Sequence, residues 1–194
     1  MVCVMTKRND LEENKTPVWN SKIFVINKSI GLAGCGLKTD LKIIVKRARK
    51  IAKNFSFVFG KQIPPNLLTN ELSNFFQEFT YSSGVRPFGL CIFIVGFGNE
   101  GPDLFQINPD GNIFYIKANI IGKKANCGLH FLNKRWNKKL NQEEAVSIGF
   151  FTLKEATEGK LNGSDINLAI VNDIGVFKIW RKKEVIHLLS KSIV

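Results

Sequence analysis

The sequence predicts an α+β fold, a four-layer α-β-β-α sandwich in which two stacked antiparallel sheets lie between two layers of helices. Apolar segments of strand length come in clusters joined by short turns, which favours antiparallel pairing. Amphipathic segments of helical period lie between these clusters, mostly in pairs, which is typical of helical layers outside two sheets. With 194 residues, 44% of them hydrophobic, the chain is expected to form one domain over residues 1–194.

The first segments of the chain have the composition of strands. Strands are expected at residues 2–5, 22–26 and 29–33, with a polar loop over residues 6–20 between the first two. A tight turn is expected at residues 34–36, because two glycines flank a single residue there. The chain should turn at this point into its first helix.

Two amphipathic helices are expected next, over residues 39–55 and 66–81. Their apolar side chains share one arc at ~100° per residue, and Lys and Arg occupy the opposite arc of the first helix. Thr39 or Asp40 is expected to cap the first helix, and the prolines at 64–65 to open the second. The apolar arcs should face a core, and the basic arc should face solvent or an acidic partner.

Residues 81–89 predict a corner between the second helix and a buried strand. A Ser-Ser-Gly sequence at 82–84 breaks the helix, and Pro87 fixes φ and lacks a donor. Arg86 lies at the start of the strand, where its guanidinium can bind a carboxylate or carbonyl groups. We therefore expect Arg86 to be structural.

The second half of the chain is expected to contain further strand pairs and helices. Asn141, with Glu144 three residues later, has the pattern of a helix N-cap. Strands are expected at residues 88–96, 104–107, 112–121, 166–171 and 175–180, and helices at residues 126–137, 142–159 and 182–191.

The net charge of +12 makes an acidic partner, including nucleic acid, a class to consider. The Phe residues fall on apolar faces instead of alternating with the basic residues, so base stacking is not indicated. No apolar run approaches the ~20 residues of a membrane span. The four cysteines are far apart in apolar segments and are expected to be buried free thiols in a reducing compartment.

Two motifs suggest ligand chemistry, but neither meets its requirements. Residues 31–39 approach a phosphate-binding loop, yet Leu37 separates the last glycine from Lys38 and displaces the lysine. Cys127 and His130 have the spacing of metal ligands on a helix, but no second pair follows nearby. No cofactor and no metal are therefore expected.

Catalytic residues are equally hard to find. The sequence lacks a recognisable nucleophile turn with Ser, His and Asp. A threonine nucleophile that uses its own amine as base is the remaining route, with Thr6 and Thr16 as the early candidates. Neither follows an obvious processing site of small residues, so no catalytic residue is predicted.

Several separate stretches together resemble one known family of threonine-peptidase type, the alpha-type subunits of the proteasome core particle. They are VKRARKIA at 45–52, SGVRPFG at 83–89, LFQ at 104–106, PDG at 109–111, KA at 117–118, IGK at 121–123, FLNKR at 131–135, LNQEEA at 140–145 and TLKEA at 152–156. Their order and spacing are specific to the family, and within it the chain is most similar to the second alpha type of eukaryotes.

The resemblance implies an Ntn-hydrolase fold and a non-catalytic structural role. Alpha subunits of this family form a seven-membered ring that contacts beta subunits, docks regulatory particles or other activators, and controls substrate entry in ubiquitin-dependent degradation in cytoplasm and nucleus. A catalytic beta-type threonine protease of the same fold is the alternative. A second alternative function is that of a basic nucleotide-binding or nucleic-acid-binding domain. No membrane partner is expected.

The resemblance also assigns site residues. Lys22 is expected to bind the terminal carboxylate of an activator tail, with Gly36 and Leu37 lining the same pocket. Arg86-Pro87-Phe88-Gly89 is the structural signature. Compared with the family pattern, residue 1 falls within the second strand, so the usual N-terminal tail, helix and first strand are not expected within these 194 residues.

Overall fold

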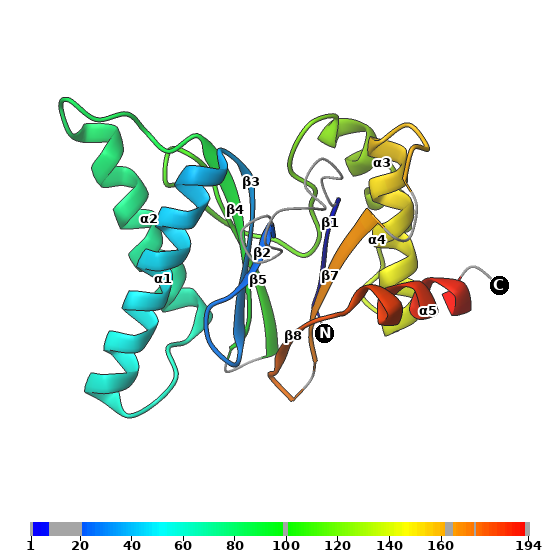
Figure 1. Ribbon diagram of the computed structural model, residues 1–194, viewed down its shortest axis with the longest axis horizontal. Coiled ribbons are helices and arrows are strands. Elements are labelled where there is room, and N and C mark those ends of the chain that lie inside the picture. The colour runs from blue at the N-terminus through cyan, green and yellow to red at the C-terminus, as the bar shows by residue number, and fades with distance from the viewer. Residues whose placement is uncertain (1, 8–20, 99–100, 162–164, 173, 193–194) are drawn as a thin grey trace.

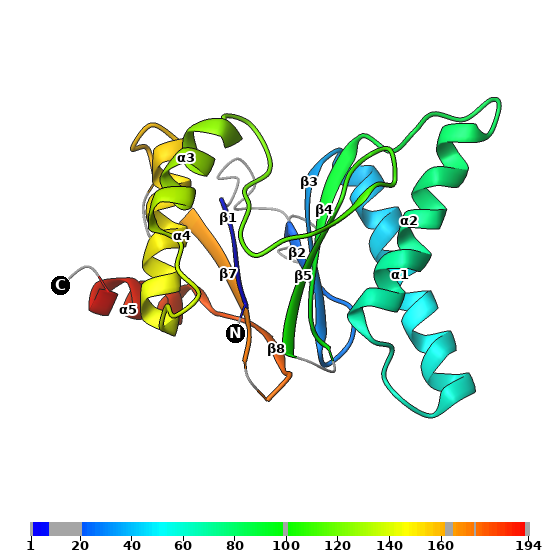
Figure 2. The same cartoon turned by 180° about the vertical axis from the view of Figure 1, so that it is seen from behind.

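The computed structural model of the chain describes residues 2–7, 21–98, 101–161, 165–172 and 174–192. These residues form four layers, two of strands between two of helices (Figures 1 and 2). Helices α1 (Lys38–Phe59) and α2 (Pro65–Tyr81) form one outer layer, and α3 (Ala125–Arg135), α4 (Gln142–Ala156) and α5 (Lys182–Ser192) form the other. The predicted α-β-β-α sandwich is therefore confirmed.

The two inner layers are antiparallel sheets. The larger has the order β2-β3-β4-β5-β6 and the smaller the order β1-β7-β8. The strands are β1 (Val2–Lys7), β2 (Ile23–Val25), β3 (Ile30–Gly36), β4 (Leu90–Gly98), β5 (Gly101–Ile107), β6 (Ile113–Tyr115), β7 (Ile166–Val171) and β8 (Phe177–Ile179). Among the strands that the structure describes, β1 pairs with β7 alone, so the other edge of β1 is open.

The largest core cluster lies between the five-stranded sheet and helices α1 and α2. Phe76 of α2 is fully buried there, together with Leu68 and Leu72 on the same stripe. Pro65 is the first residue of α2, where its missing N–H costs no hydrogen bond. The Phe-rich stripe of this helix is therefore core, as its spacing predicted.

Two further apolar clusters hold the other layers together. Phe177 of β8 lies in the cluster between the sheets. Its ring packs directly on Gly31, because a Cβ added to Gly31 would lie only 2.0 Å from the ring. The Phe177 N–H also donates to the Lys28 carbonyl at 2.9 Å, which ties the two sheets at one edge. The last cluster packs α4 and α5 on the small sheet. At the start of α4, Asn141 and Glu144 form the predicted capping box.

Three local predictions were wrong. The first helix begins at Lys38 with Leu37 as its N-cap residue, because the Asp40 side chain is engaged elsewhere and does not cap. Residues 34–36 are not a turn, since β3 pairs with β4 as far as Gly36. The strand expected over 112–121 ends at Tyr115, and the chain then crosses towards the small sheet.

The described part of the chain has no helix that is both long and apolar enough to cross a membrane. Most of the loop expected over residues 6–20 lies outside the described residues, apart from Thr6 and Lys7, which belong to β1.

Candidate functional site

An ion pair organises the corner at residues 81–89. Arg86 donates two hydrogen bonds to Asp40, Nη1 to Oδ2 and Nη2 to Oδ1, each at 2.8 Å. Arg86 Nη1 also donates to the Pro87 carbonyl at 3.0 Å, and the Gly89 N–H donates to Asp40 Oδ2 at 3.0 Å. This planar, two-point geometry suits a guanidinium better than an ammonium.

Asp40 is the partner of Arg86 that sequence reasoning missed. It is only 3% exposed, although it lies in the first turn of a helix. The Arg86 guanidinium holds the pKa of its carboxyl below the usual value by hydrogen bonding to the charged form, against the opposing effect of burial. Arg86 and Asp40 are 46 positions apart, so no local pattern pairs them.

The other signature residues anchor the corner in the core. Phe88 is buried against Phe75, Phe76 and Phe79 of α2, with ring centroids 5.6, 5.1 and 4.5 Å away. Such tilted contacts between aromatic rings add to the gain from burial. Pro87 itself remains exposed.

Gly36 and Leu37, two of the expected pocket residues, contact the signature directly. Gly36 has φ +137°, and a Cβ added there would lie 2.3 Å from the Gly89 carbonyl oxygen. The Leu37 N–H donates to that same carbonyl at 3.0 Å, while its side chain remains 50% exposed. The expected pocket edge and the signature are therefore one junction at the ends of β3 and β4.

Lys22, the third expected pocket residue, lies beside this junction. Its carbonyl accepts the Gly34 N–H at 3.0 Å, which places it at the start of β2 and next to the end of β3. Its ammonium donates to the Lys7 carbonyl at 3.2 Å, at the end of β1. The three residues thus belong to neighbouring strand ends, and the role in tail binding stays a prediction.

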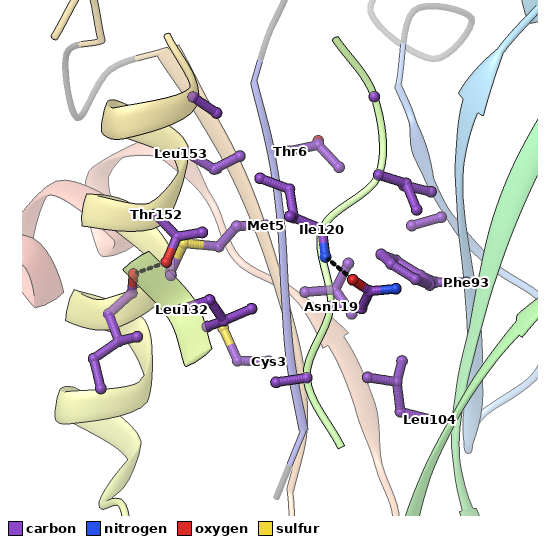
Figure 3. A pocket seen from close by; sticks show the side chains of 18 of the residues that line it. Cys3, Met5, Thr6, Phe93, Leu104, Asn119, Ile120, Leu132, Thr152 and Leu153 are labelled. Atoms are coloured by element: carbon purple, nitrogen blue, oxygen red, sulfur yellow. Dashed lines mark hydrogen bonds between the residues drawn. The ribbon is translucent and has the colours of Figure 1, made fainter. Parts of the chain in front are cut away.

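A cavity of about 1010 Å³, which sequence reasoning also missed, is lined by Lys22 and by residues along β1. In Figure 3 the segment with Asn119 and Ile120 passes between β1 and the side chains of Phe93 and Leu104. The Thr6 hydroxyl is buried here and has no hydrogen-bond partner within the described residues. The lysines that line the cavity are Lys7, Lys22, Lys117, Lys123, Lys124, Lys138 and Lys160. Segments this far apart in sequence leave no local signal of a shared cavity.

The structure also places the residues of the alternative chemistries. Residues 31–36 are extended strand, so they cannot cradle a phosphate as a loop does. Cys127 and His130 are exposed on α3, and within the described ranges no three His, Cys, Asp or Glu side chains converge. Thr6 lies inside β1 opposite Asn167, and Thr16 falls outside the described residues.

Comparison with known proteins agrees with this architecture. The family described as "Proteasome subunit" matches residues 1–171. Proteasome subunit alpha type-2 of Saccharomyces cerevisiae is 39% identical over 155 residues, which cover 79% of this chain and 62% of the yeast protein. The same-named protein of Dictyostelium discoideum is 38% identical, over 81% of this chain and 68% of its own length. That of Drosophila melanogaster is 35% identical, over 84% and 71%.

The match therefore spans less than two thirds of the length of the yeast relative and slightly more than two thirds of the lengths of the other two. It nevertheless covers most of this chain, including the junction of Gly36 with the Arg86 signature. On this evidence the chain belongs to the proteasome subunit family, and the relatives that it resembles are alpha type-2 subunits.

Proposed function

We propose that this chain is a non-catalytic structural subunit of the alpha ring of the proteasome core particle. The observation that carries the proposal is the similarity to alpha type-2 subunits over 79% of the chain. The intact Arg86 corner supports it, because that corner joins the expected pocket edge to the core. In this role the subunit would serve ring assembly, activator docking and substrate entry in ubiquitin-dependent degradation, in cytoplasm and nucleus.

The surface of α1 supports a role in an assembly with neighbouring alpha and beta subunits. Phe57 is 92% exposed at the end of this helix, and the adjacent Val58 and Phe59 are also exposed. Exposed apolar side chains that gather at one place on a surface are candidates for a protein–protein contact. The basic arc of the same helix offers charge complementarity to an acidic neighbour.

The position of Thr6 argues against the catalytic alternative. A threonine nucleophile of this class needs its own free amine as base. Thr6 is instead within a paired strand, and its hydroxyl is buried. Thr16, the other candidate, lies outside the described residues, so the expectation of a non-catalytic role rests on the similarity to alpha type-2 subunits.

One experiment tests ring membership and the lack of catalysis together. The tagged chain is co-expressed with the other core-particle subunits, and the assembled particle is treated with a mechanism-based probe for threonine proteases. We expect native mass spectrometry to find the chain in the particle, and the probe to label other subunits but not this one. Labelling of this chain, or its exclusion from every assembled ring, would contradict the proposal.

The proposed tail pocket gives a sharper prediction for Lys22. Lys22→Ala removes the cation that would meet the tail carboxylate, a contact worth ~1.5–3 kcal/mol. Binding of an activator-tail peptide at this pocket should weaken about tenfold or more, measured on rings whose other pockets are disabled. Ring assembly should persist.

Two variants control this measurement. Lys22→Arg keeps the charge but changes reach and geometry, so it should restore binding only in part. Lys46→Ala removes an exposed lysine from the outer face of α1 and should leave tail binding unchanged. Equal affinities for the wild-type and Lys22→Ala rings would show that Lys22 is an ordinary surface lysine, and failed assembly would place it in a subunit interface.

A further inference from the structure

Two of the cysteines lie directly opposite each other in the five-stranded sheet. Cys35 of β3 is the register partner of Cys91 of β4. Residues paired in this way project from the same face of a sheet. Both are free thiols, but the expectation that the cysteines are buried was wrong, since both residues are partly exposed. They are 56 positions apart in sequence, so only the strand register reveals the pair.

The hydrogen-bond pattern defines the spacing of this pair. The Leu37 N–H donates to the Gly89 carbonyl, so residues 37 and 89 form a hydrogen-bonded pair in the same ladder. Such pairs alternate with non-hydrogen-bonded ones, so Cys35 and Cys91 form a hydrogen-bonded pair, with a typical Cα–Cα distance of ~5.5 Å. Disulfides require Cα–Cα distances of ~4.4–6.8 Å, so the backbone positions permit a bond.

The surroundings leave both thiols able to react. Cys35 lines the cavity beside β1, and its Sγ faces Gly122, where an added Cβ would lie only 3.1 Å away. Cys91 Sγ lies 3.2 Å from Asn108 Oδ1 and 3.4 Å from the Ile107 carbonyl, and Gln106 Nε2 donates to it at 3.5 Å. These partners are on β5 and just beyond it, so rotation about the Cα–Cβ bond is needed to turn Cys91 towards Cys35.

We propose that Cys35 and Cys91 are a redox-active dithiol that closes reversibly to a cross-strand disulfide. The oxidant is a low-molecular-weight disulfide such as oxidised glutathione. The Cys35 thiolate attacks one glutathione sulfur and expels one glutathione thiolate. Cys91 then loses its proton and attacks Cys35 Sγ, which expels the second glutathione. Two protein thiols are oxidised, and one glutathione disulfide is reduced to two thiols.

The order of these two steps follows from the environments of the thiols. Burial raises the pKa of the Cys91 thiol, so Cys91 is the poorer first nucleophile and the resolving residue. Its attack becomes intramolecular once glutathione is bound to Cys35. Cys35 is the residue that faces the cavity, through which a small oxidant can approach.

The geometry also indicates that the disulfide would be easily reduced. Cβ atoms of directly opposed residues are ~4.5–5.5 Å apart, whereas a relaxed disulfide has ~3.5–4.5 Å. The strain favours return to the dithiol in a reducing environment. Because Cys35 precedes Gly36 and Cys91 follows Leu90, the bond would tie the two strands next to the junction of Gly36 with Gly89. The proposal rests on this register and not on the proposed function.

The test equilibrates the purified, reduced protein with mixtures of oxidised and reduced glutathione, followed by alkylation and peptide mass mapping. We expect a peptide pair linked through Cys35 and Cys91, an intact mass of the Cys127→Ser variant that is lower by two hydrogens, and full reversal by dithiothreitol. Cys91→Ser should leave Cys35 as a persistent mixed disulfide with glutathione. Cys35→Ser should abolish the link and leave Cys91 largely unmodified.

The other two cysteines supply controls. Cys127 is exposed on α3, so Cys127→Ser should preserve the link between Cys35 and Cys91. Burial raises the pKa of the Cys3 thiol to about 12, so Cys3 should stay reduced throughout. The proposal is overturned if Cys127 of the wild-type protein becomes glutathionylated while no link forms between Cys35 and Cys91. It is also overturned if Cys35 links to a different cysteine instead. The wild-type measurement decides the matter even if a serine variant fails to fold.

Discussion

Gly36→Ala is expected to lower the free energy of unfolding by ~2–6 kcal/mol, from backbone strain and overpacking together. Gly36 has φ +137°, a conformation that residues with a side chain rarely adopt. The added Cβ would also lie 2.3 Å from the Gly89 carbonyl oxygen and 2.6 Å from Leu90 Cα, both of which are backbone atoms. Neither can move without displacing β4. Denaturant unfolding of the purified protein measures the loss.

Gly60→Ala is the matched control for this variant. Gly60 also has a positive φ, +67°, at the end of α1, but nothing lies within 4 Å of an added Cβ. Its replacement should cost only the ~1–2 kcal/mol of a left-handed conformation. Equal losses for the two variants would show that β4 yields easily, and that the close approach of Gly36 to Gly89 does not constrain the junction.

Asp40→Asn is expected to lower the free energy of unfolding by ~1.5–3 kcal/mol, the value of hydrogen bonds to a charged group. The variant keeps an acceptor for the Gly89 N–H but loses the two-point ion pair with Arg86. Arg86→Ala should also lower the melting temperature, because it leaves the buried Asp40 carboxylate without its guanidinium. Thermal and denaturant unfolding of both variants check these effects.

The same pair predicts a dependence of stability on pH. The folded-state pKa of Asp40 is lowered below its unfolded value. The contribution of the Asp40 carboxylate to folding stability is therefore fully present above about pH 4 and is lost as pH falls through the folded-state pKa. The wild-type protein should therefore lose more stability on acidification than Asp40→Asn. Glu158→Gln is the control, because Glu158 pairs with Lys124 on the exposed surface and should matter little. Parallel acid losses in wild type and Asp40→Asn would contradict the assigned role.

Elements that depend on interactions between residues close in sequence could be predicted well from the sequence. The apolar stripe of α2, the proline at its first position and the capping box of α4 each involve residues within about one helical turn. The Cys35–Cys91 pair is different, because it depends on the register between β3 and β4. Helices α1 and α2 connect these strands, so no tight turn fixes their register locally.

By itself the sequence determined the order of the layers, the residues of the core-facing helical stripes and the corner at residues 81–89. These features follow from the spacing of apolar residues and from helix-ending residues such as Gly and Pro, and both signals act locally. Only the tertiary structure decided that Asp40 binds Arg86 instead of capping α1, since that ion pair forms across 46 positions. It likewise decided that β3 continues through Gly36, where two glycines had indicated a turn. There the pairing with β4 outweighs the local preference, because the missing side chain lets the Gly89 backbone approach closely.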